Sequence, residues 1–145
     1  MSKPAIYSTF IALFVAASLS AQTNTKAEQL ILENFNQQVQ CWNKGDNDCY
    51  CQGYVKSPET HTISSRGFTY GYDTIVAQYK KNWPKEKMGL LSFDQLKMEK
   101  LSGSAYMVHG KFNLAYEQAK PVSGYFTVIM KKIKGRWLMY ADHTS

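Results

Sequence analysis

The sequence predicts an α+β fold in which helices come first and strands come later. Three segments in the first half repeat apolar residues at helical spacing, whereas β-branched and aromatic runs dominate the second half. Near the C-terminus, residues 124–133 and 136–144 flank Lys134 and Gly135, which is the signal of a β-hairpin. Helices gathered before strands indicate α+β architecture rather than alternating βαβ units.

The first two dozen residues have the features of a secretory signal peptide. Lys3 supplies a positive charge, residues 5–17 are mostly apolar, and Ala21 follows small residues suited to cleavage. The apolar run is shorter than the roughly 20 residues that a membrane-spanning helix needs. We therefore expect residues 1–21 to be removed, residues 22–145 to form one domain, and the mature protein to be periplasmic or secreted.

The mature chain is mildly basic. Loss of residues 1–21 leaves 16 basic and 11 acidic residues, a net charge of +5. The lysines are scattered, and no basic stripe interleaved with stacking aromatics marks a nucleic-acid-binding surface. We expect no nucleic acid partner, no membrane partner after cleavage, and no metal or cofactor.

Two helices and a turn are predicted at the start of the mature chain. Thr25 and Glu28 form a capping box, and the helix that follows carries an apolar stripe that ends before Gly45. Asp46 caps a second, short helix that continues through Tyr54 and ends before a proline. The apolar stripe of the first helix consists of Ile31, Phe35, Val39 and Trp42.

A third helix follows two short strands at residues 60–64 and 68–70. Asp73 is predicted to cap this helix, and Pro84 stops it. Its inward face carries Ile75, Val76, Tyr79 and Trp83. Long strands are then predicted at residues 90–99, 104–116, 124–133 and 136–144. Three helices packed on the concave face of a curved antiparallel sheet would enclose a conical cavity.

Several motifs, taken in order, resemble those of one superfamily. They are residues 41–46, residues 71–75 with Tyr79, residues 89–93, and the strands at 105–112, 126–132 and 137–145. With these, the chain resembles SnoaL-like, ketosteroid isomerase-like domains of the nuclear transport factor 2-like superfamily, in particular its small exported bacterial members. The resemblance covers nearly all the mature chain and implies a cystatin-like cone. Its isomerase branch implies a base aspartate and a tyrosine that stabilises an oxyanion.

Three cysteines, Cys41, Cys49 and Cys51, lie within eleven positions of one another. In an oxidising compartment Cys41 could pair with Cys49 or with Cys51, because the latter two are too close in sequence to bridge easily. Buried free thiols are an equally weighted alternative. A zinc site that combines the three thiolates with His61 would lack any standard spacing.

Alternation along the last strand selects the candidate catalytic residue. Trp137, Met139, Ala141 and His143 share one face, and Asp142 lies on the other. The resemblance favours the Trp137 face as the interior one, so we expect His143 to face the cavity as a general acid or base, with Tyr54 as a hydrogen-bond donor. The alternative is that His143 only caps the end of the sheet.

The expected ligand-binding residues are mostly aromatic, which suits a small apolar or ring-shaped molecule. They are Tyr54, Tyr79, Trp83, His109, Tyr125, Asp142 and His143. The alternative is that the aromatic rings are packed core.

Three functions follow from these expectations. The first is an exported domain that binds a small apolar molecule in its cone. The second is a proton-transfer enzyme of the isomerase or dehydratase type that uses His143. The third is an assembly module that forms a homodimer through the outer face of the sheet.

Overall fold

Helices and strands segregate along the chain as the sequence predicts. The structure, a computed structural model, describes residues 24–145, so the predicted signal peptide lies outside the described residues. Within residues 24–145 the elements are α1 (Lys26–Asn43), α2 (Asn47–Cys51), β1 (His61–Ser64), β2 (Gly67–Tyr70), α3 (Tyr72–Asn82), the 3-10 turn η1 (Lys85–Lys87), β3 (Leu90–Lys100), β4 (Ala105–Ala115), β5 (Val122–Ile133) and β6 (Arg136–Thr144). The predicted α+β class is confirmed.

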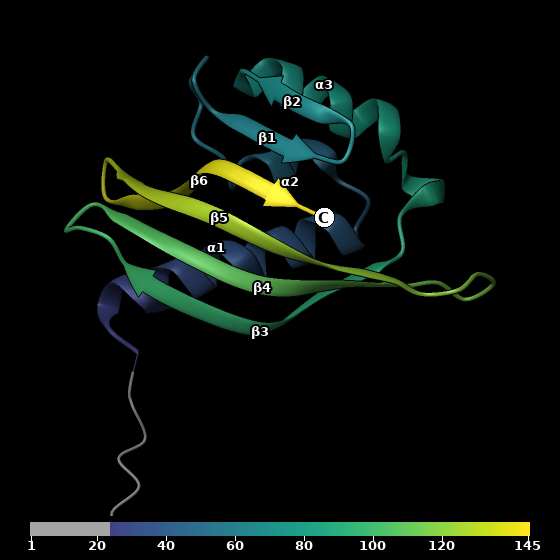
Figure 1. Cartoon of the computed structure of the whole chain (residues 1–145). Helices are drawn as coiled ribbons and strands as arrows, with labels where there is room; N and C mark the ends of the chain where they lie inside the picture. The colour runs from purple at the N-terminus through teal and green to yellow at the C-terminus, as the bar shows by residue number, and fades with distance from the viewer. Residues whose placement is uncertain (1–23) are drawn as a thin grey trace, which may run out of the picture.

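The strands of the described region form one curved sheet in the order β2-β1-β6-β5-β4-β3 (Figure 1). Strands β3 to β6 are antiparallel neighbours, and β1 joins the sheet parallel to β6. The predicted hairpin between β5 and β6 turns at Lys134 and Gly135, whose φ angles are 48° and 81°. Two successive positive φ angles match the twist of the flanking strands, which explains the glycine at the second position.

The helices cover one face of the sheet, which we call the inner face (Figure 1). The capping box of α1 is present: the Thr25 amide donates to Glu28, and the Glu28 amide donates to Thr25 Oγ1. Phe35 of α1 packs against Phe93 of β3 and Phe126 of β5, with ring centroids 5.2 and 5.8 Å away. Burial of each such ring contributes about 1.5–3 kcal/mol, so this cluster holds α1 on the sheet.

Two predicted helix boundaries are wrong. Helix α2 ends at Cys51 and does not reach Tyr54, because the chain beyond it pairs with β6: the Val55 amide donates to the Met139 carbonyl, and the Met139 amide donates to the Gly53 carbonyl, both at 2.8 Å. Helix α3 begins after Gly71, which has a φ of 87°, and no side chain caps it. Asp73 lies in the first turn, where its negative charge interacts favourably with the positive end of the helix dipole.

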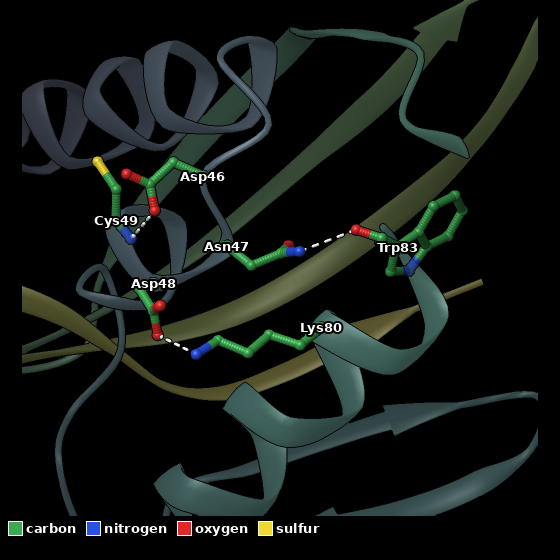
Figure 2. Close-up of polar contacts among 6 residues, drawn as sticks. All are labelled: Asp46, Asn47, Asp48, Cys49, Lys80 and Trp83. Carbon is green, nitrogen blue, oxygen red and sulfur yellow. Dashed lines mark hydrogen bonds and ion pairs between the residues drawn. The ribbon is translucent and has the colours of Figure 1, made fainter. Parts of the chain in front are cut away.

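Helix α2 holds the C-terminal half of α3 in place (Figure 2). Asp46 caps α2 by accepting from the Cys49 amide at 2.9 Å. Asn47 Nδ2 donates to the Trp83 carbonyl at 2.8 Å, and Asp48 pairs with Lys80 at 2.8 Å. Asn47 is buried, whereas the Lys80 pair is exposed and adds little. The Asn47 bond therefore fixes the end of α3, from which Tyr79 and Trp83 project.

A disulfide joins Cys41 of α1 to Cys49 of α2, with Cα atoms 5.4 Å apart. This confirms one of the two predicted pairings and removes two of the three thiolates required for the zinc alternative. Cys51 is a free, fully buried thiol, and burial raises its pKa to about 12. Among residues 24–145, no helix has both the length and the apolar character needed to cross a membrane.

Candidate functional site

A cavity of about 460 Å³ lies between the helices and the inner face of the sheet. This volume is within the range of small-molecule pockets, about 300–1,000 Å³. Its apolar and aromatic wall comprises Phe35, Trp42, Tyr50, Ile63, Phe68, Tyr79, Trp83, Leu91, Phe93, Phe112, Leu114, Phe126, Val128 and Met139. Its polar lining comprises Thr62, Ser64, Arg66, Thr69, Gln78, Lys81, Asn82, Asp142 and Thr144.

Within residues 24–145, Asp142 is the one acidic residue in this lining, and it is buried. Its Oδ2 atom accepts a 2.6 Å hydrogen bond from the Tyr54 hydroxyl, and its Oδ1 atom accepts a 2.9 Å bond from Thr144 Oγ1. Tyr54 reaches this position because the backbone around it is bonded to Met139 on β6. Two hydroxyl donors therefore fix a carboxylate in a largely apolar cavity.

A β-bulge in β6 decides which residue faces the cavity. Ile129 pairs with Ala141 but the next residue, Met130, pairs with Met139, so Tyr140 is an extra residue in β6. An extra residue reverses the side-chain alternation beyond it. Trp137 and Met139 face inward as predicted, but Asp142 then takes the inner face.

The expectation that His143 faces the cavity is therefore wrong. Phe126 and Val128 line the cavity, so Thr127 between them points to the opposite, outer face of the sheet. His109 and His143 are the cross-strand partners of Thr127 on β4 and β6, and they share its face. His109 Nδ1 lies 3.0 Å from Thr127 Oγ1, while His143 is exposed.

The other predicted site residues divide between the two faces. Tyr79 and Trp83 line the cavity beside Asp142. Tyr54 lies behind Asp142 rather than in the wall, and it is 1% exposed. Tyr125 points to the outer face and is 61% exposed, because it follows the same alternation as Thr127.

Two phenols and one carboxylate form a directed chain of hydrogen bonds. The Tyr79 and Tyr54 oxygens are 3.1 Å apart, and Tyr54 bonds Asp142 at 2.6 Å. Each phenol has one hydrogen. If Asp142 is ionised, Tyr54 gives its hydrogen to the carboxylate, so Tyr79 must donate to Tyr54. The chain then presents only acceptor oxygens to the cavity, and a bound molecule would satisfy them with a hydrogen-bond donor.

Burial sets the protonation of this chain. Desolvation raises the pKa of Tyr54 and of Tyr79 above the ordinary phenol value, and the nearby Asp142 charge raises both further. Both phenols therefore stay neutral at physiological pH. Desolvation also raises the pKa of Asp142, and the hydrogen bonds from Tyr54 and Thr144 oppose that rise without cancelling it.

The Asp142→Asn variant is expected to be more stable than the wild type at neutral pH. Asparagine keeps an acceptor for Tyr54 and carries no charge to desolvate. The folded-state pKa of Asp142 is raised above its unfolded-state value. The contribution of Asp142 to the free energy of unfolding is therefore fully present below the unfolded-state pKa and is lost as the pH rises through the folded-state pKa. Urea unfolding from about pH 4 to pH 8 should show the advantage of the variant growing with pH.

The matched control is Asp94→Asn, which changes an exposed aspartate bonded to Asn113. Any change in its free energy of unfolding measures what an aspartate-to-asparagine substitution does outside the cavity. A difference between Asp142→Asn and the wild type that is constant with pH, or that favours the wild type at neutral pH, would contradict a carboxylate whose pKa is raised by burial.

Comparison with known proteins shows where this fold belongs. Neither the protein-family models nor the curated proteins include a match. A solved structure from Shewanella oneidensis MR-1, described as an NTF-2-like protein of unknown function, is 35% identical, with a TM-score of 0.76; the match covers 81% of this chain and 98% of that one. This chain therefore belongs to the nuclear transport factor 2-like superfamily.

More distant structures share the fold. A nuclear transport factor 2-like superfamily protein from Salmonella enterica serovar Typhimurium LT2 is 19% identical, with a TM-score of 0.67 and coverage of 82% of this chain and 89% of that one. A Novosphingobium aromaticivorans DSM 12444 protein, provisionally assigned as a scytalone dehydratase, is 9% identical, with a TM-score of 0.67 and coverage of 81% of each chain. These structural similarities show the cone-shaped fold that the sequence resemblance predicts.

Proposed function

We propose that this protein is exported and binds a small, mainly apolar ring compound in its cavity, with Asp142 accepting a hydrogen bond from it. The observation that carries the proposal is the buried carboxylate of Asp142 in the wall of a 460 Å³ cavity lined by aromatic rings. Rings in the wall supply apolar contact area, and a fixed acceptor supplies orientation.

The disulfide supports export. Disulfides persist in oxidising compartments and are rare in reducing ones. The Cys41–Cys49 bridge therefore agrees with the features of a signal peptide in residues 1–21.

Binding can be tested with N-phenyl-1-naphthylamine, a neutral three-ring fluorophore that brightens in apolar surroundings and carries one N–H donor. We expect saturable binding at one site per chain. Thr62, on the inner face of β1, lines the cavity, so Thr62→Trp should fill it and abolish the fluorescence change.

The control is the same substitution on the outer face, Thr127→Trp, which should leave the titration unchanged. Thermal melts of both variants would show that each is folded. Absence of saturable binding to the wild type, or equal binding by the two variants, would contradict a ligand cavity.

A second candidate is proton-transfer catalysis with Asp142 as the general base. The observation that favours it is the raised pKa of a carboxylate that lines an apolar cavity, because a base is most effective when its pKa approaches the working pH. The role expected of Tyr54, that of a hydrogen-bond donor in catalysis, does not suit the state in which Asp142 is ionised, since the Tyr54 hydrogen is directed at Asp142. The structural similarity to the distant dehydratase shows only a shared fold and gives no support for a reaction. This candidate function therefore rests on Asp142.

A further inference from the structure

The acidic and the basic residues that line the cavity lie in different parts of it. Asp142 is buried in its wall, whereas Arg66, in the turn between β1 and β2, and Lys81, on α3, are exposed members of the same lining. We call the part of the cavity edge formed by Arg66 and Lys81 the basic rim. Among the residues that the structure describes, no other charged residue lines the cavity.

Neither residue of the basic rim has an acidic partner within 4 Å among residues 24–145. The contrast with Lys80 is informative, because Lys80 is next to Lys81 on α3 and pairs with Asp48 at 2.8 Å (Figure 2). One lysine of this pair is thus used to join α3 to α2, and the other borders the cavity. The Arg66 backbone amide bonds Ser64 Oγ at 3.2 Å, which holds the turn that carries the arginine.

Two unpaired cations at the edge of an apolar cavity produce a positive potential that favours an anion there. Guanidinium groups bind carboxylate, sulfonate and phosphate oxygens through paired N–H donors, and an ammonium adds a point charge. The buried Asp142 favours a different group, because its carboxylate repels an anion and accepts a hydrogen bond from a donor. A ligand that satisfies both regions has a donor at one end and an acid at the other.

We propose that the ligand of this cavity is a ring compound that carries an anionic group, with that group seated at the basic rim and a hydrogen-bond donor directed at Asp142. The proposal rests on the ligand-binding function proposed above. It adds the chemical class: an aromatic or alicyclic acid rather than a neutral hydrocarbon or sterol-like molecule.

The test compares two probes that share an anilinonaphthalene framework. 6-Anilinonaphthalene-2-sulfonate carries its sulfonate at the opposite end of the naphthalene from its N–H donor, and N-phenyl-2-naphthylamine lacks the sulfonate. We expect the wild type to bind the sulfonate more tightly than the neutral probe. In the double variant Arg66→Gln/Lys81→Gln the affinity for the sulfonate should fall by about threefold to tenfold, and the affinity for the neutral probe should not change. Raising the salt concentration should weaken sulfonate binding to the wild type and have little effect on the neutral probe.

A charge-matched control is Lys120→Gln/Arg136→Gln, which removes one lysine and one arginine that are exposed and lie outside the cavity lining. Its affinity for both probes should equal that of the wild type. Displacement of the sulfonate by the neutral probe would show that the two share one site, and failure to compete would overturn the proposal.

The outcomes separate this inference from the function on which it rests. If both probes bind with equal affinity, or if the rim variant weakens both equally, the anionic class is wrong and the cavity still binds ligands. If neither probe binds, the ligand-binding proposal fails and the inference fails with it.

Discussion

5-Nitrobenzisoxazole is expected to lose its C3 proton to Asp142 when it occupies the cavity. The proton passes to a carboxylate oxygen, the C–H electron pair forms the nitrile, and the N–O bond breaks to release a coloured cyanophenolate. A carboxylate in apolar surroundings with a raised pKa is a stronger base than one in water. Asp142→Asn should reduce kcat/KM by about 10²–10⁴-fold, measured from the absorbance of the product.

The pH profile and a histidine variant make this test specific. Activity should rise with pH through a pKa above the ordinary carboxyl value, because only the ionised form accepts a proton. His143→Gln should retain full activity, since His143 points away from the cavity. Loss of activity in His143→Gln but not in Asp142→Asn would reverse the assignment made from the bulge, and absence of any protein-dependent rate would exclude the catalytic candidate.

Removal of the Cys41–Cys49 disulfide is expected to cost about 2–4 kcal/mol of the free energy of unfolding. The bridge closes a short loop between α1 and α2, and α2 in turn fixes the end of α3 through Asn47. A Cys41→Ser/Cys49→Ser variant should therefore unfold at lower urea concentration. It should also bind N-phenyl-1-naphthylamine more weakly, because Tyr79 and Trp83 in the cavity wall project from α3.

Cys51→Ser is the matched control, because this thiol is buried and unbridged. It should not alter the response of the protein to a reducing agent. Intact mass measurement on the exported protein should show two hydrogens fewer than the reduced chain and the loss of residues 1–21. Three free thiols in that material would contradict the bridge.

Much of the fold could be predicted because it depends on local signals. The capping box at Thr25 and Glu28 and the turn at Lys134 and Gly135 each involve residues close in sequence, and both are present. The boundary of α2 depends instead on a distant contact. Pairing of residues 53–55 with Met139 on β6 ends the helix, and no local sequence signal marks this contact.

The candidate site was harder to predict for the same reason. Strict alternation from Trp137 placed His143 inside, whereas the bulge at Tyr140 places Asp142 there. A bulge depends on how two strands pair, and β6 carries no glycine that would have indicated it. Arg66 and Lys81 were missed because exposed cations in a turn and on a helix are ordinary in sequence, and only the fold brings them to one cavity.

The bulge also has an evolutionary consequence. In a regular strand each position is either inside or outside, so new chemistry in the cavity requires a new residue at an inner position. Here Asp142 and His143 are adjacent, and the extra residue Tyr140 selects between them. If the same residues paired without the bulge, with Tyr140 retained, regular alternation from Met139 would bring His143 to the inner face and turn Asp142 outward, so an imidazole would replace a carboxylate in the cavity with no substitution at either residue. Gain or loss of a bulge in this strand is thus a route by which members of the superfamily could exchange the acid or base in the cavity on one scaffold.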